Sequence, residues 1–135
     1  MAFNGYLLQV GSYQITGENF INEKSYKATL NIQDLDSYRD ANGVLHRNAL
    51  DHVPLKVEIN TRPGLNNFEW ADFMGTIRAN FTVPKERKCV LTAFIPEIND
   101  YVTQNVYMPD PEVTIDLIDK NIIKYGSIRL AFIGY

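Results

Sequence analysis

The side chains best suited to chemistry gather in one polar stretch, residues 34–51. Aspartates recur there at short spacing, and an Asn-Gly pair at 42–43 supplies a tight turn. Alternating oxygen ligands followed by a glycine are typical of a calcium-binding loop. The spacing departs from that pattern, because counting from Asp34 puts Tyr38 and Arg39 where a third ligand and the glycine belong. We therefore expect a solvated or partner-contacting segment, with calcium binding as the alternative.

The other reactive side chains are too few to build a catalytic or metal site. His46 and His52 are the only histidines and Cys89 is the only cysteine, whereas a transition-metal site needs three or four such ligands. Cys89 lies in the apolar run CVLTAFI, which predicts a buried thiol and no disulfide. The chain has neither a Gly-x-Ser-x-Gly elbow nor a glycine-rich phosphate loop. We expect no enzymatic activity, no catalytic residue, no metal and no cofactor.

The composition is that of an ordinary globular protein. A length of 135 residues, with 45% hydrophobic and 21% charged residues, predicts a single domain that spans residues 1–135. The net charge of −3 argues against a surface that grips nucleic-acid phosphates or an anionic membrane. There is no apolar run of membrane-spanning length and no basic flank of a signal peptide at the start. We expect a soluble protein that is cytosolic when made.

Two segments that alternate like β-strands flank the polar stretch. Strict alternation of apolar and polar residues is typical of a strand with one buried face, so strands are expected at 25–35 and 53–61. Residues 34–51 would then form a long hairpin arm that projects from the sheet. Such an arm has little apolar content with which to pack on its own domain. The alternating residues are Tyr26, Ala28, Leu30 and Ile32 before the arm, and Val53, Leu55, Val57 and Ile59 after it.

One amphipathic helix follows the second of these strands. Asn66 is placed to act as N-cap with Glu69 three residues later, which is the spacing of a capping box, and Leu65 and Trp70 are spaced for a hydrophobic staple. An apolar stripe with helical spacing predicts that one face of the helix lies on the sheet. A tryptophan in such a stripe is interpreted as a core residue and not as a ligand-stacking residue. The stripe consists of Trp70, Phe73, Met74 and Ile77.

The rest of the sequence favours short strands joined by tight turns. The unbroken apolar run at 89–95 predicts a central strand covered on both faces. Most connections are too short for parallel crossovers. The predicted fold is mainly β with one α-helix: an antiparallel β-sandwich, or a curved sheet or barrel, with one packed helix. The other expected strands are 3–10, 13–15, 101–108, 113–118 and 127–135, and residues 119–125 are expected to form a loop.

The order of these motifs resembles a known group of proteins. The run LNIQDLDSYRDANGVLHRNAL, followed by KVEINT, a helix and YVTQNVYMPDPEV, is similar to small structural proteins from the tail modules of tailed bacteriophages and prophages. The resemblance covers most of the chain from Ser25 onward. It implies a non-enzymatic subunit of a tail tube, tail tip or baseplate hub, often assembled as a ring. It also implies assembly in the host cytoplasm with further copies and other tail proteins, and a final place in the virion tail.

The resemblance and the polar arm together give a specific hypothesis. Residues 34–50 would contact an adjacent subunit or the next layer of the tail, with Tyr38 and Leu45 as apolar anchors and Arg39 and Arg47 bonded to carboxylates. We expect no contact with a membrane and no sequence-specific nucleic-acid binding. A ligand- or carbohydrate-binding β-sandwich at the tail tip, with calcium at the arm, is the alternative. The predicted interface residues are Asp36, Tyr38, Arg39, Asp40, Asn42, Leu45, His46 and Arg47.

Overall fold

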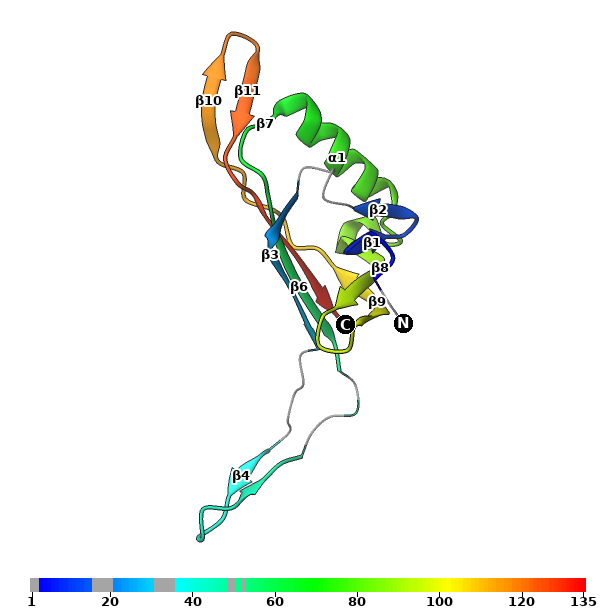
Figure 1. The fold of residues 1–135 in the computed structure, drawn as a ribbon, viewed down its shortest axis with the longest axis vertical. Helices are drawn as coiled ribbons and strands as arrows, with labels where there is room; N and C mark the ends of the chain where they lie inside the picture. Colours follow the sequence, from blue (N-terminus) through cyan, green and yellow to red (C-terminus); the bar gives the residue numbers. More distant parts are fainter. Residues whose placement is uncertain (1–2, 16–20, 31–35, 49–50, 52) are drawn as a thin grey trace.

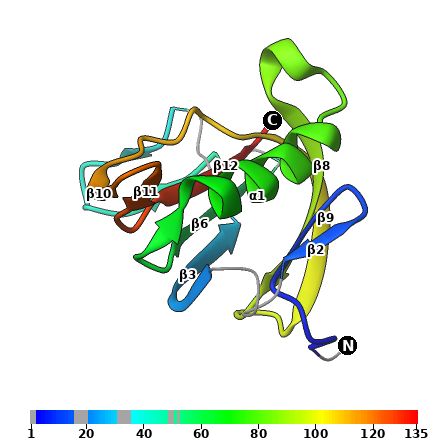
Figure 2. The same cartoon turned by 90° about the horizontal axis from the view of Figure 1, so that it is seen from above.

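A curved antiparallel sheet forms the body of the protein in the computed structural model, which describes residues 3–15, 21–30, 36–48, 51 and 53–135. The strands of this sheet are β1 (Leu8–Val10), β2 (Tyr13–Ile15), β3 (Ile21–Leu30), β6 (Leu55–Thr61), β8 (Lys88–Ile95), β9 (Asp100–Tyr107) and β12 (Arg129–Gly134). Their order across the sheet is β2-β1-β8-β9-β12-β6-β3. One helix, α1 (Asn67–Ala79), covers one face of the sheet, as Figure 2 shows.

The sheet curves so strongly that the edge strand β3 approaches β8, the third strand in this order. The hydroxyl of Tyr26 on β3 donates to the carbonyl oxygen of Phe94 on β8 at 2.6 Å, although three strands lie between them in the sheet order. β2 and β3 remain its two edges, and no ladder joins them in the described part of the chain. The predicted mainly β fold with one packed helix is therefore confirmed, as a curved sheet that does not close into a barrel.

The core lies between the sheet and the helix. On β6, Leu55, Val57 and Ile59 are buried and alternate with more exposed residues, as their spacing predicts. On β12, Leu130 and Phe132 are fully buried, and Ala131 between them is buried as well. Each of these side chains removes apolar surface from water, which is the main favourable term in folding. The other large side chains that are fully buried are Leu8, Ile15, Ile21, Ile77, Leu91, Ile95, Met108 and Ile128.

The helix begins as its sequence predicts. The side-chain oxygen of Asn66 accepts from the backbone N–H of Glu69 at 2.8 Å, and the Glu69 carboxylate accepts from the backbone N–H of Asn66 at 3.2 Å. This capping box satisfies two donors that the first helical turn leaves without partners. Trp70 packs against the core beside Phe73, with ring centroids 6.0 Å apart. The interpretation of Trp70 as a core residue is confirmed.

Two small sheets lie outside the large one. In the first, β10 (Ile115–Asp119) pairs with β11 (Ile122–Tyr125), which pairs in turn with β7 (Leu65–Asn66) beside the start of the helix. In the second, β4 (Tyr38–Arg39) pairs with β5 (Leu45–His46). Figure 1 shows these two hairpins at opposite ends of the longest axis, with the curved sheet between them. A short 3-10 helix, η1 (Pro84–Glu86), precedes β8.

Two expectations about strand β8 and residues 119–125 were wrong. β8 is buried on alternate residues only, and Val90 on its other face is 37% exposed, so the run at 89–95 is not covered on both faces. Residues 119–125 are not a loop, because β11 pairs along β10 from Asp119↔Ile122 onward. The connecting turn has Lys120 in the left-handed region at φ 55°, a conformation that favours glycine or asparagine, and the sequence gives no such signal there.

The ends of two other strands also differ from their sequence prediction. β1 starts at Leu8 and not at residue 3. β3 starts at Ile21 because a bulge accommodates the polar residues between Asn22 and Lys27. Inside the bulge the Ser25 hydroxyl accepts from the backbone N–H of Asn60 at 2.8 Å and replaces a ladder partner. The predicted end of this strand, at residues 31–35, lies outside the described residues.

Candidate subunit interface

The described part of the arm, residues 36–48, is a small hairpin that we call the arm tip. Tyr38 pairs with His46 and Arg39 with Leu45 across its two strands. The backbone N–H of Asp40 donates to the carbonyl of Val44 at 3.0 Å and closes the turn. Gly43 has φ 80°, the left-handed conformation that the Asn-Gly pair predicts. The predicted tight turn is therefore where the sequence places it.

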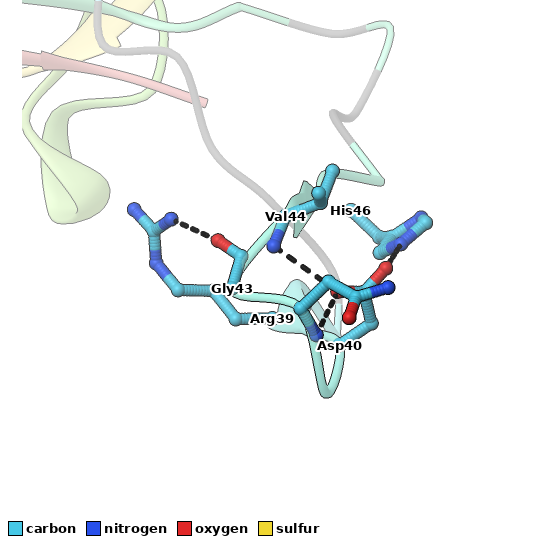
Figure 3. A network of polar contacts seen from close by, with 6 residues as sticks. Arg39, Asp40, Gly43, Val44 and His46 are labelled. Atoms are coloured by element: carbon cyan, nitrogen blue, oxygen red, sulfur yellow. Dashed lines mark hydrogen bonds and ion pairs between the residues drawn. The ribbon is translucent and has the colours of Figure 1, made fainter.

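Asp40 organises the arm tip (Figure 3). One of its carboxylate oxygens accepts from the backbone N–H groups of Asn42 and Val44 at 2.9 and 3.1 Å. The other lies 2.9 Å from Nε2 of His46. The hydrogen bond from His46 is the largest cause that holds the pKa of Asp40 below its ordinary value. The hydrogen bonds from the two amides lower this pKa further. Asp40 and His46 therefore stabilise the fold of the tip itself.

Apolar side chains and the guanidinium of Arg39 lie on the outside of the arm tip. Tyr38 is 60% exposed and its ring stacks on His46, with centroids 4.9 Å apart, while Leu45 is 44% exposed beside Val44. Nη1 of Arg39 donates to the carbonyl of Gly43 at 2.9 Å, which uses one of the five N–H donors of the guanidinium. This surface combines apolar anchors with a charged donor, as protein interfaces commonly do.

The structure brings most of the predicted interface residues together. Asp36, with φ 53°, lies just before β4, and Arg47 follows β5 directly. A contact of these residues with another subunit stays a prediction. Within the arm, residues 34, 35, 49 and 50 lie outside the described residues, and so does His52, which follows the arm. The tip residues in or beside the two strands are Tyr38, Arg39, Asp40, Asn42, Leu45 and His46.

No group of three His, Cys, Asp or Glu side chains is placed to hold a metal ion in the part of the chain that the structure describes. A depression of about 190 Å³ lies over β3 and β6, lined by Lys27, Thr29, Lys56 and Glu58. Ligand pockets are usually larger, with volumes of about 300 Å³ or more, and mostly apolar. In the same described residues, no helix has both the length and the apolar character needed to cross a membrane.

Sequence reasoning missed a second exposed surface, on the hairpin formed by β10 and β11, residues 115–125. We call it the apolar hairpin. Every residue of β10 is exposed, although three of the five are Ile or Leu. The signal in the sequence is the pair of apolar runs on either side of Lys120 and Asn121, which match a hairpin with a two-residue turn. Its exposed apolar residues are Ile115, Leu117, Ile118 and Ile122.

Comparison with known proteins places the chain in a family. The match to DUF6711, described as a family of unknown function, spans residues 1–135. The chain belongs to this family. The DUF6711 chain is also similar in fold to a chain in a solved structure of the tail of an empty GTA particle, obtained by helical refinement with C6 symmetry. The two chains are 14% identical, the match covers 99% of this chain and 95% of the other, and the TM-score is 0.54. No curated protein matches this DUF6711 chain.

Proposed function

We propose that this chain is a structural subunit of the tail of a phage-like particle, and that it acts by assembling with further copies and not by turnover. The observation that carries the proposal is the likeness of its fold, over nearly the whole of both chains, to a chain from the C6-symmetric tail of an empty GTA particle. A tail with that symmetry contains copies arranged as rings about one axis. The chain would assemble in the host cytoplasm as a ring of the tail tube, tail tip or baseplate hub.

The arm tip supports this proposal because two large side chains on its outer surface are exposed. The polar groups of Asp40 and His46 are used inside the tip, whereas Tyr38 and Leu45 remain exposed. A two-stranded hairpin is at best marginally stable alone in water. Contact with another subunit would bury the exposed apolar side chains and order the tip. Arg39 and Arg47 would bind carboxylates of that subunit.

The direct test is the assembly state of the purified protein. We expect the wild-type chain to form rings or stacks of rings, seen by sedimentation velocity and by electron microscopy, with the proportion rising with concentration. A chain that remains monomeric at the highest soluble concentration, both alone and with a co-expressed neighbour from the same tail module, would overturn the proposal. Since the particle has other tail proteins, the same measurement with a co-expressed neighbour from the same tail module distinguishes self-assembly from templated assembly.

A matched pair of substitutions tests the arm. Leu45→Ser changes a residue of the tip that is 44% exposed, and Ile98→Ser changes one that is 49% exposed in the turn between β8 and β9. We expect Leu45→Ser, alone or with Tyr38→Ser, to raise the protein concentration needed for half-maximal assembly by about tenfold or more. Ile98→Ser should leave this concentration unchanged. Deletion of residues 36–45 should have a larger effect. If the deleted chain folds and assembles like the wild type, the arm is not an interface.

A further inference from the structure

The apolar hairpin is held firmly at its base and free at its tip. Tyr125 pairs with Leu65 on β7, and its carbonyl accepts from the backbone N–H of Gly64 at 2.9 Å. The backbone N–H of Ile123 donates to the side-chain oxygen of Asn67, at the start of α1, at 3.1 Å. These contacts fix β11 against the body, while β10 forms the outer edge of the small sheet. An edge strand of this kind offers unpaired backbone groups as well as side chains to a partner.

The apolar hairpin exposes apolar side chains on both of its faces. Leu117 pairs with Lys124 and Ile118 pairs with Ile123, so Leu117 and Ile118 are consecutive and point to opposite faces. They are 53% and 62% exposed. An antiparallel sheet that packs on its own core usually has one apolar and one polar face. Contiguous exposed apolar side chains instead mark a surface that another protein can cover.

The outer strand of the apolar hairpin carries carboxylates that a guanidinium of the arm tip can bind. Asp116 and Asp119 on β10 have no ion-pair partner among the described residues. The guanidinium of Arg39, in the tip, uses one donor within its own hairpin. Each hairpin carries charges of both signs, because Lys120 and Lys124 accompany these aspartates, and Asp36 and Asp40 accompany Arg39. The contact would therefore pair individual carboxylates with individual cations. Because the two hairpins lie at opposite ends of the longest axis (Figure 1), they cannot meet within one copy.

We infer that the apolar hairpin of one copy is the surface that receives the arm tip of another copy. This inference rests on the proposed function and names the partner surface that the arm requires. Tyr38 and Leu45 of one subunit would pack against Leu117 and Ile118 of the next, and Arg39 would bind the carboxylate of Asp116 or Asp119. Because the two surfaces differ and lie at opposite ends of the chain, a pair of subunits joined in this way still has one free arm tip and one free apolar hairpin, so the contact can add further layers.

A complementation experiment tests the pairing. One variant, Tyr38→Ser with Leu45→Ser, has a damaged arm tip and an intact apolar hairpin, and a second, Leu117→Ser with Ile118→Ser, has the reverse. Thermal unfolding first confirms that both are folded, which we expect because all four side chains are exposed. Alone, each variant should stop at a single layer. Mixed in equal amounts, they should form a species of twice that mass and no longer stack, because only one intact pairing remains between them.

The possible outcomes separate the inference from the proposed function. If the wild type stacks and the mixture gives the double layer, with Ile98→Ser stacking normally, the pairing is supported. If the wild type stacks while the apolar-hairpin variant stacks equally well, or the mixture forms no joint species, the pairing is overturned and the proposed function stands. If the arm-tip variant alone forms double layers, the apolar hairpins bind each other and the pairing is also overturned. A wild type that is monomeric both alone and with the co-expressed neighbour overturns both.

Discussion

Tyr26 and Phe94 join two strands that are far apart in the sheet. The phenol hydroxyl of Tyr26, on the edge strand β3, donates to the Phe94 carbonyl on β8 at 2.6 Å. The ring of Tyr26 packs against the core, and its burial is the main cause that raises the pKa of the phenol above its ordinary value. In a closed barrel a further strand pairing would join the two ends of the sheet. Here the Tyr26 hydrogen bond links β3 to β8 and stabilises the curvature of the open sheet.

Removal of this hydroxyl should destabilise the protein modestly. Tyr26→Phe keeps the ring and deletes one intramolecular hydrogen bond, so the free energy of unfolding should fall by about 1 kcal/mol. Urea denaturation measures the change. Tyr38→Phe is the matched control, because Tyr38 is exposed and its ring stacks on His46. Equal stabilities of the Tyr26 variant and the control would mean that the contact contributes nothing to the fold.

The capping box gives a prediction about the helix. Asn66→Ala removes the acceptor for the Glu69 N–H, and should lower the free energy of unfolding by about 1 kcal/mol. Asn66→Asp retains an acceptor at the same place and should stay near the wild-type value. Thermal unfolding followed by circular dichroism measures both variants. A loss of stability in Asn66→Asp as large as that in Asn66→Ala would contradict a capping role.

The arm tip should lose order in acid. Since the pKa of folded Asp40 is lower than its ordinary value of 3.8, its stabilising effect is fully present above that value. It is lost as the pH falls through the lowered pKa of the folded tip. The amide signals of Asn42 and Val44 in NMR spectra should therefore collapse toward random-coil positions below pH 3.8 while those of the sheet persist.

Two substitutions isolate the acid response of the tip. Asp40→Asn removes the titrating group, so the amide of Val44 should no longer change position in that pH range. Asp36→Asn, just outside the hairpin strands, should leave the transition as in the wild type. An acid transition of the same midpoint in Asp40→Asn would show that another group controls the order of the tip.

Cys89 should behave as an unreactive core thiol. Its side chain is fully buried, and burial raises the pKa of the thiol to about 11. Alkylation at pH 8, followed by mass spectrometry, should be far slower in the native protein than in denaturant. The fold disfavours the thiolate, so the folded chain keeps the proton of Cys89 at pH values where the unfolded chain has lost it. The contribution of Cys89 to stability is therefore present below pH 9 and is lost as the pH rises toward about 11. In Ser37→Cys, an exposed thiol in the arm tip should react at once and serve as the control.

Calcium should have no effect on stability. Asp40 already accepts three hydrogen bonds within the arm tip, and among the described residues no group of three His, Cys, Asp or Glu side chains is placed to hold an ion. Thermal unfolding with calcium and with a chelator should therefore give the same Tm. A rise in Tm that depends on calcium and disappears in Asp40→Asn would instead favour the alternative of a calcium-assisted binding protein.

Features that depend on residues close together in the sequence were predictable. The cap at Asn66, the buried face of Phe73, Met74 and Ile77, and the tight turn at Gly43 each depend on residues within a few positions of one another. The alternation along β6 also identified its buried face, because a strand with one solvated face has a strict two-residue period. The same reasoning found the arm residues, whose chemistry is concentrated in one stretch.

Features that depend on distant contacts were not predictable in this way. The run at 89–95 is mostly apolar on both faces, yet Val90 is exposed, since no second layer of described residues covers it. The early start of β3 depends on Ser25 replacing a backbone partner for Asn60, a residue 35 positions away. The apolar hairpin was missed because Lys120, in its turn, adopts a left-handed conformation that is uncommon for lysine.

The self-contained bonding of the arm tip has a consequence for how such chains diversify. The turn, the Asp40 carboxylate and the stacked side chains of Tyr38 and His46 all come from residues 38–46. The segment therefore forms a unit, a cassette, that could be exchanged between chains as a whole. Relatives that share the body are then able to acquire new binding preferences by replacing a few surface side chains, with no repacking of the interior. On the pairing that we infer between arm tip and apolar hairpin, two such chains made in one cell would sort into separate particles when each arm tip fits only its own apolar hairpin.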